Sequence, residues 1–286
     1  MKDYSWIRKE LKHLINENPT DEGIFASLTN RISMFKGKLY KYFSFSQNDE
    51  NHALDNLKND LIYYSNPLKF NDPFDCSLSL SLNDLEKPYI NELFKKNNRV
   101  SKAIIRQMVA QKLPELDEMA KDSVAQILGV SCFAERPDNI LMWSHYADKH
   151  TGFCVEYDFL NIAPNDLCVF LYPAIYAQQK AFIPTNMFDF SDLTKITPRP
   201  TNLWLADWIQ VLLTKSNIWE YESEWRSIAV LQRLSKERTI KQKIISKVYL
   251  GCKISDENEK IIREIAKKKN IAVQKYEMDI NEYRLK

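Results

Sequence analysis

The sequence predicts an α+β fold, with a mixed or antiparallel split sheet, a helical N-terminal preface and a helical insert. Short runs rich in aromatic and β-branched residues, such as 39–43 and 224–230, are typical of strands. Between such runs lie segments whose apolar residues recur every three or four positions, which is the spacing of an amphipathic helix. Because the two patterns alternate without an internal repeat or a flexible linker, we expect both kinds of element within one domain.

The predicted preface covers residues 1–36, and the predicted single domain covers residues 37–286. In the preface, apolar residues at helical spacing indicate one helix that closes before Asn18-Pro19, since proline disfavours helix in the preceding residue. A second helix is expected over 23–34.

The predicted insert, at about 84–128, combines a helical pattern with a high charge content. Proline removes a backbone donor and clashes with the preceding turn of a helix. We therefore expect two or three helices there, broken near Pro88 and Pro114.

The other expected elements alternate between strands and helices along the domain. The expected strands are 39–43, 61–65, 129–133, 152–157, 169–172, 174–176, 224–230, 247–251 and 271–276, and the expected helices are 53–58, 138–147, 201–217 and 256–269. We expect 169–172 and 174–176 to pair with each other as two neighbouring strands.

Composition excludes several classes of protein. Hydrophobic residues make up 44% and charged residues 27% of the chain, which is typical of a folded domain rather than a disordered one. The net charge of +2 is too small to imply a polyanionic partner, although residues 232–286 hold 15 basic and 8 acidic residues. That basic part, with Lys267-Lys268-Lys269, is a candidate for nucleic-acid contact, although such a charge excess is typical of a solvated helix face.

The pattern of cysteines and the lack of a long apolar stretch both indicate the cytoplasm as the location of the protein. The five cysteines are scattered and never form a C-x-x-C pair, which favours reduced thiols over a disulfide framework. Neither a signal-peptide pattern nor an apolar stretch of about 18 residues occurs in the sequence. We expect a cytoplasmic protein without a membrane partner.

A first group of candidate site residues accompanies the first two predicted strands. It consists of Tyr40, Lys41 and Tyr42, then Tyr63, Tyr64 and Ser65, then the turn Asn71-Asp72-Pro73-Phe74-Asp75. Such residues form either a ligand-binding loop or an aromatic core beside a capped turn, and both interpretations stay open.

A second group surrounds two of the four histidines, His145 and His150. Zinc could be imagined on Cys132, His145, His150 and Cys154, but the spacing matches no zinc-ligand pattern cleanly, and we expect no metal. A Cys–His nucleophilic pair has the residue types, but nothing in the sequence places either cysteine next to His145 in space. The structural alternative is that Trp143, His145 and Tyr146 pack a buried polar network.

A third group lies between Lys215 and Arg226. If this segment is extended, Glu220, Glu222 and Glu224 point to one face, with Lys215 and Arg226 as the local counter-charges. These carboxylates suit a general base or the stabilisation of an oxocarbenium-like centre. A solvated strand face with ion pairs is the alternative.

Four strings of residues together resemble a known family. They are Leu39-Tyr40-Lys41-Tyr42, Tyr64-Ser65-Asn66-Pro67 with Phe70 to Asp75, Met142 to Ala147 with His150-x-Gly152-Phe153, and Trp219-x-Tyr221-Glu222-x-Glu224-Trp225-Arg226. In this order they resemble a bacterial family catalogued as domain of unknown function 2971, over roughly residues 39–276. The family name carries no activity.

The sequence also resembles the ADP-ribosyltransferases, which have a split α+β fold and a late Glu/Gln-x-Glu motif, here Glu222-Ser223-Glu224. The resemblance implies NAD as co-substrate, with Glu224 holding the ribose and stabilising positive charge as nicotinamide leaves, and Glu222 orienting the acceptor. It implies that Tyr64 and Ser65 line the nicotinamide pocket. No Arg or His stands on the first strand, so Lys41 or a tyrosine would replace it.

Three function classes follow from these groups. The first is an ADP-ribosyltransferase-like enzyme or NAD glycohydrolase of a bacterial defence or toxin type, acting on a small nucleotide and transferring to an unknown acceptor. The second is a non-enzymatic binding or sensing module in anti-phage defence, with Trp143 and His145 in its ligand pocket. The third is a hydrolase or nuclease that uses His145 with Glu156 or Asp158.

Overall fold

A computed structural model shows how these segments fold. It describes residues 37–45, 53–76, 82–86, 90–96, 99–161, 169–180, 188–189, 197–198 and 211–286. By their contacts, the described residues within 37–65, 130–174 and 218–286 form one compact unit, here called the sheet unit. Those within 66–129 and 175–217 form a second one, here called the insert unit. Each unit is described by itself.

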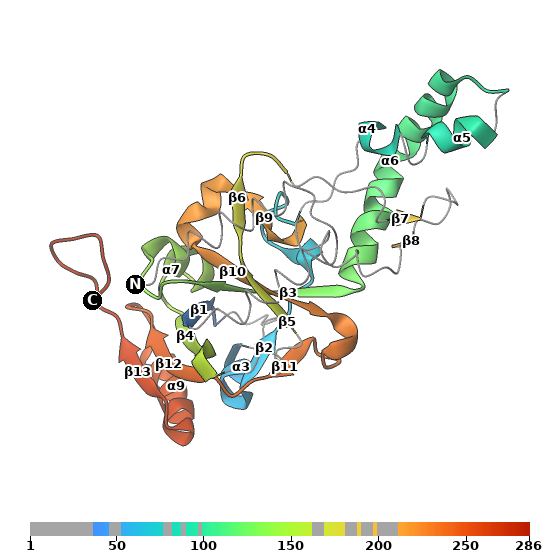
Figure 1. Ribbon diagram of the computed structural model, residues 1–286. Helices are drawn as coiled ribbons and strands as arrows, with labels where there is room; N and C mark the ends of the chain where they lie inside the picture. The colour runs from blue at the N-terminus through green and yellow to red at the C-terminus, as the bar shows by residue number, and fades with distance from the viewer. Residues whose placement is uncertain are drawn as a thin grey trace. The chain divides into compact units, whose positions relative to one another are not determined.

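The sheet unit contains a seven-stranded mixed sheet in the order β13-β12-β4-β1-β3-β10-β5 (Figure 1). Its strands are β1 (Lys38–Phe43), β3 (Leu128–Ala134), β4 (Phe153–Asp158), β5 (Val169–Pro173), β10 (Glu224–Val230), β12 (Ile245–Leu250) and β13 (Ala272–Lys275). β1 is antiparallel to both of its neighbours, and β12 is parallel to β13. This mixed sheet with its helices confirms the predicted α+β class.

Smaller elements surround this sheet. They are α3 (Ala53–Asn59), β2 (Leu61–Tyr63), α7 (Ile140–Tyr146), η3 (Phe159–Asn161), η5 (Asn217–Glu222), η6 (Leu231–Arg233), β11 (Thr239–Lys241) and α9 (Asp256–Lys269), where η marks a 3₁₀ helix. β2 and β11 form a separate antiparallel pair. The predicted strands and α-helices of this unit occur in the predicted order, whereas β11 was not predicted.

The sheet buries side chains on both of its faces. Paired residues of an antiparallel sheet share a face, and the register pairs Tyr42 of β1 with Cys154 of β4, and Cys154 with Tyr249 of β12. These three residues pack with Trp143 of α7 in one buried cluster. α7 therefore covers this face and is held against β1.

Helix α9 connects the two parallel strands β12 and β13, and Figure 1 shows it beside them at one edge of the sheet. Ser255 caps its N-terminus by accepting a hydrogen bond from the backbone N–H of Asn258. Asn270 ends it in a left-handed conformation, and acidic and basic residues occupy its first and last turns. The bounds agree with the predicted helix 256–269.

The insert unit is mainly helical. Its elements are η1 (Pro67–Lys69), α4 (Leu82–Leu85), α5 (Asn91–Lys96), α6 (Lys102–Ala125), β6 (Ile175–Ala177), β7 (Phe188–Asp189), β8 (Thr197–Pro198) and β9 (Thr214–Ser216). α4, α5 and β8 contact the long helix α6, while β6 pairs with β9 in parallel.

Two predictions about these elements are wrong. Helix α6 continues through Pro114 instead of breaking there, because one proline removes a single hydrogen bond and this one is exposed at the helix surface. The segments 169–172 and 174–176 do not pair with each other, since β5 pairs with β10 and β6 pairs with β9. Only Pro173 separates them, whereas a hairpin needs a loop of about two residues.

Other predictions fall partly on residues that the structure does not describe. The preface 1–36 lies outside the described residues, as do the surroundings of Pro88 at 87–89. Of the predicted helix 201–217, only 211–217 is described, and it turns from helix into β9 at Thr214. Among the described residues, no helix combines the length and the apolar character that crossing a membrane requires.

Candidate functional site

Helix α7 and the 3₁₀ helix η5 are joined by side-chain hydrogen bonds. Asn139 caps α7 by accepting from the backbone N–H of Leu141, and its Nδ2 atom donates to the carbonyl oxygen of Tyr221, at 2.7 Å. At the other end of α7, the Tyr146 hydroxyl donates to Glu222 Oε1, also at 2.7 Å. The sequence left open whether these two segments converge, and the structure brings them together.

Four aromatic side chains gather where α7 and η5 meet, and we call them the ring cluster. They are His145, Tyr146, Trp219 and Tyr221. The His145 ring lies 6.2 Å from Trp219 and 6.3 Å from Tyr146, and Trp219 lies 6.0 Å from Tyr221, between ring centroids. His145 is exposed and the other three are partly exposed. The cluster therefore offers aromatic surface to solvent.

Glu222 lies at the base of this cluster. Its residue is 3% exposed, and its carboxylate accepts the hydrogen bond from Tyr146. Sequence reasoning named Glu222, His145 and Tyr146 but gave no role to Trp219, Tyr221 or Asn139. The signal for Asn139 was present, because asparagine is a preferred residue immediately before a helix.

The expectation that Glu220, Glu222 and Glu224 share one strand face is wrong. The first two lie in η5, and Glu224 begins β10 after Ser223, whose φ of 45° ends the 3₁₀ helix. With about three residues per turn, positions two apart on a 3₁₀ helix point in different directions. Accordingly Glu220 is exposed, while Glu222 is buried.

Glu224 forms a buried ion pair with Arg226 inside the sheet. Arg226 Nε lies 2.9 Å from Glu224 Oε1, and Nη2 lies 3.1 Å from Oε2. The two residues are 3% and 0% exposed, and as i and i+2 on a strand they share a face. Burial raises the pKa of the nearby Cys132 thiol well above its usual value, and the charge of Glu224 raises it further. Cys132 is therefore a neutral thiol.

Lys41 lies on β1, and its Nζ donates to Ser131 Oγ at 2.6 Å. The same ammonium stands 5.4 Å from the centre of the Phe133 ring. Burial lowers the pKa of Lys41 to about 8, which is the direction that desolvation imposes on a cation. The structure does not place Lys41 in the ring cluster.

Tyr42 and Trp143, both candidate ligand-binding residues, form contacts within the sheet unit. The Tyr42 hydroxyl donates to the carbonyl oxygen of Arg136, and Trp143 Nε1 donates to that of Pro137, both at 2.7 Å. Their rings meet edge to face at 5.4 Å. The contacts of Trp143, which belongs to the second group, agree with the alternative of a buried polar network.

Tyr64 and Ser65 are likewise held within the sheet unit. Tyr64 is 0% exposed and its hydroxyl shares a hydrogen bond with Ser227 Oγ at 3.0 Å. Ser65 forms a backbone bridge with Val130 of β3. Both residues are therefore held within the sheet unit and do not line the ring cluster.

A second buried carboxylate, Glu156 of β4, is surrounded by hydrogen-bond donors. The sequence did not predict that these residues form a cluster. The Glu156 carboxylate accepts from Lys38 Nζ at 2.6 Å, Ser246 Oγ at 2.7 Å and the Tyr249 hydroxyl at 3.0 Å. Burial alone would raise the pKa of Glu156, but these donors outweigh it and lower the pKa. Burial and the charge of Glu156 together raise the pKa of neighbouring Tyr40.

The remaining candidates, Asn71, Asp72 and Lys215, belong to the insert unit. Asn71 is exposed, and Asp72 Oδ1 accepts from the backbone N–H of Phe74 at 2.8 Å, which is a capped turn. Lys215 Nζ lies 3.6 Å from Asp75 Oδ2, and both side chains are 5% exposed. Sequence reasoning included Asp75 in the turn but did not pair it with Lys215.

The imagined zinc ligands do not assemble in the part of the chain that the structure describes. No group of three or more His, Cys, Asp or Glu residues is placed there to hold a metal ion. His150 Nε2 contacts Ser144 Oγ at 3.3 Å, and its ring stacks on Trp143 at 6.2 Å. Burial lowers the pKa of His150, so this imidazole is neutral at pH 7.

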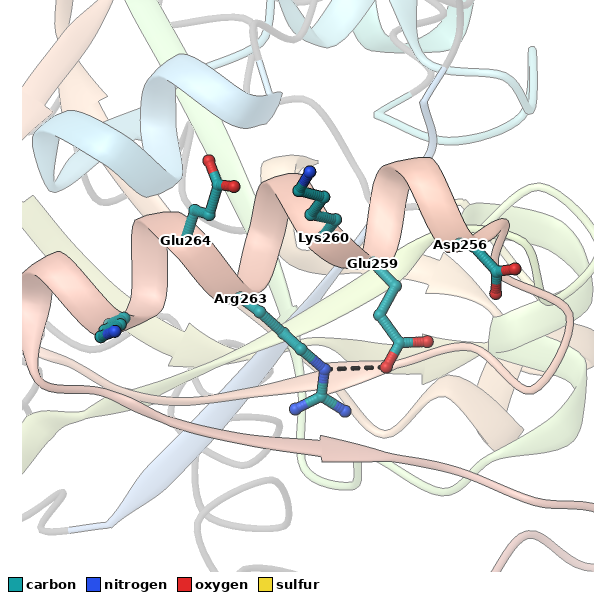
Figure 2. A pocket seen from close by; sticks show the side chains of 6 residues that line it. Asp256, Glu259, Lys260, Arg263 and Glu264 are labelled. Carbon is teal, nitrogen blue, oxygen red and sulfur yellow. Dashed lines mark hydrogen bonds and ion pairs between the residues drawn. The ribbon is translucent and has the colours of Figure 1, made fainter.

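An open hollow of about 430 Å³ runs along α9 (Figure 2). Three acidic and three basic residues line it: Asp256, Glu259, Lys260, Arg263, Glu264 and Lys267. Figure 2 shows the ion pair of Arg263 with Glu259, a spacing of four residues that is typical of a solvated helix face. Beyond the hollow, Lys269 of the basic tail pairs with Asp60 at 2.6 Å.

The fold and the ring cluster define an α+β protein whose α7 and η5 segments present exposed aromatic rings over a buried carboxylate. Residues 142–227 match the family described as Protein of unknown function (DUF2971). This matched segment contains most of α7, all of η5 and the start of β10, and it supports the resemblance there, whereas the strings 39–42 and 64–75 lie outside it. No curated protein and no solved structure matches the chain significantly.

Proposed function

We propose that the protein binds NAD with the nicotinamide ring on the ring cluster and cleaves the nicotinamide–ribose bond, as an ADP-ribosyltransferase or NAD glycohydrolase does. The observation that carries this proposal is the Glu222 carboxylate, which Tyr146 holds at the base of exposed aromatic rings. The nicotinamide of NAD is planar and positively charged. Aromatic faces attract cations, and a carboxylate in a poorly solvated place adds to that attraction.

The chemistry assigns a role to Glu222. When the bond between ribose C1′ and the nicotinamide nitrogen breaks, its electron pair leaves with nicotinamide and the ribose becomes an oxocarbenium ion. A fixed carboxylate stabilises that developing positive charge. Water or an acceptor hydroxyl then bonds to C1′ and loses its proton to solvent. Glu224, which the transferase resemblance favoured for this role, here positions β10 through its ion pair with Arg226.

Nicotinamide release from NAD tests the proposal. We expect release by the wild-type protein and a loss of about 100-fold in Glu222→Gln, the size typical of removing one electrostatic stabiliser of a transition state. Glu224→Gln is the matched control, since it changes a buried glutamate two residues away, and its folded fraction should keep most of the activity. Equal losses in two folded variants, or an unaffected Glu222→Gln, would contradict the role of Glu222.

A second candidate function is a sensing module that binds the same ligand without turnover. It is favoured by the burial of Glu222, which is 3% exposed while the rings of the cluster remain partly open to solvent. The release assay also separates the two functions. Stabilisation of the wild-type protein by NAD, without any nicotinamide release, would support the sensing module.

A further inference from the structure

The insert unit contains a cavity of about 270 Å³ beside its two-stranded sheet. Its lining comes from three segments: Phe74 of the capped turn, Ala177, Gln178, Gln179 and Lys180 at the end of β6, and Val211, Thr214, Lys215 and Ser216 of β9 and the helical turn before it. The parallel register of β6 and β9 sets Ala177 opposite Ser216. The strand ends thus form a fixed wall.

The charge of this lining has one sign. Two of the lining residues are lysines, Lys180 and Lys215, and none is acidic. Lys215 is buried and its ammonium lies 3.6 Å from the Asp75 carboxylate, whereas Lys180 is exposed. Thr214 and Ser216 add hydroxyl groups, and the two glutamines add amides. Such a set of donors favours an anionic group, and phosphate accepts several hydrogen bonds at once.

The remaining wall is an aromatic platform. Phe74 is 66% exposed, although the turn around it is well fixed. Asp72 caps that turn at the backbone N–H of Phe74, and Cys76 Sγ contacts the carbonyl oxygen of Leu212 at 3.8 Å. Lys180 Nζ stands 5.6 Å from the Phe74 ring centre. A large, exposed and preorganised aromatic ring beside cations suits the stacking of a nucleobase.

We infer that this cavity binds a mononucleotide, with its phosphate at Lys180 and the hydroxyls of Thr214 and Ser216 and its base on Phe74. The exposed lysine and the hydroxyls supply the anion site, and the ring supplies the base site. The inference concerns residues of the insert unit alone and does not depend on NAD chemistry at the ring cluster.

Titration calorimetry with AMP, ribose 5-phosphate and adenosine tests this site. The two variants are Phe74→Ala and Lys180→Gln. Both change exposed side chains and leave the buried Lys215–Asp75 pair intact. Lys260→Gln on the charged face of α9 is the matched control for removal of one lysine.

We expect AMP to bind the wild type more tightly than either ribose 5-phosphate or adenosine. Phe74→Ala should weaken AMP roughly tenfold, the effect of losing one base–aromatic stack, and should leave ribose 5-phosphate binding unchanged. Lys180→Gln should weaken both phosphorylated probes, and Lys260→Gln neither. Absence of AMP binding at millimolar concentration, AMP binding that is equal in all variants, or adenosine binding as tight as AMP binding would overturn the inference.

Discussion

Glu222 and Glu224 are two residues apart and equally buried, yet the regions around them differ. Glu224 belongs to strand β10, where its charge is paired with the guanidinium of Arg226 inside the sheet. Glu222 ends the 3₁₀ helix η5, where the phenol of Tyr146 holds it beneath the ring cluster. The same residue type therefore has a structural position in one region and a position suited to a ligand in the other.

The backbone between them produces this difference. Ser223 adopts a φ of 45°, so the chain changes from 3₁₀ helix to strand at one residue. That change directs Glu224 into the sheet and Glu222 toward α7. Burial of a carboxylate alone does not identify a functional site, and the element that carries it and the groups beside it must be considered together.

The largest expected effect on stability comes from breaking the ion pair of Glu224 with Arg226 in the sheet. Arg226→Met should lower the free energy of unfolding by about 3–5 kcal/mol, because it leaves the Glu224 carboxylate buried without the guanidinium. Urea denaturation measures this loss. The double variant Glu224→Gln/Arg226→Met should recover part of it, and a loss below about 1 kcal/mol in the single variant would show that the pair does not hold β10 in place.

A further buried glutamate, Glu156, extends the comparison to the pH dependence of stability. Its donors lower its pKa in the folded state below the ordinary value of 4.5. Because this pKa is lowered, the contribution of Glu156 to the free energy of unfolding is present above pH 4.5. It is lost as the pH falls through the pKa of the folded state. Glu156→Gln should therefore cost about 2 kcal/mol at pH 7 and progressively less in acid.

Urea denaturation of wild type and Glu156→Gln between pH 7 and pH 3 measures this dependence. Ser246→Ala is a milder comparison, because it removes one donor and keeps the carboxylate. A difference between Glu156→Gln and the wild type that grows as the pH falls would have the wrong sign for a carboxylate with a lowered pKa.

A smaller effect on stability is expected on the ring-cluster side. Tyr146→Phe keeps the ring and removes the hydrogen bond to Glu222, which should cost about 1 kcal/mol of unfolding free energy. If Glu222 acts on NAD, the same variant should reduce nicotinamide release more than this stability loss explains. Tyr42→Phe, which removes a hydroxyl bonded to a backbone carbonyl, is the matched control and should keep its activity when folded.

Local patterns allowed much of the fold to be predicted. Runs of aromatic and β-branched residues predicted β1 and β10, because such side chains suit a half-buried pleated surface. Helix α9 is also determined locally, because the residues that cap it lie directly beside it in the sequence. The β5 and β6 partners could not be inferred in the same way. Their pairing is decided by contacts with segments far along the chain.

The candidate site was predictable in its residue types but not in its geometry. His145, Tyr146 and Glu222 were all named from the sequence, while the hydrogen bond that joins Tyr146 to Glu222 spans 76 residues. The glutamate alternation was misleading, because positions two apart share a face only in a strand, and Glu220 and Glu222 lie in a 3₁₀ helix with three residues per turn. Trp219 gained importance only from its exposed ring beside His145.

The effect of Trp219→Ala on NAD binding tests the central claim most directly. Trp219 is partly exposed, and its neighbour Ile218 is 78% exposed without belonging to the ring cluster, so Ile218→Ala is the matched control. Titration calorimetry with NAD should show affinity roughly tenfold weaker in Trp219→Ala and unchanged in Ile218→Ala, with both proteins folded under the conditions of the titration. Equal NAD affinity in wild type and Trp219→Ala, or no NAD binding by the wild type, would contradict the claim that the ring cluster binds nicotinamide.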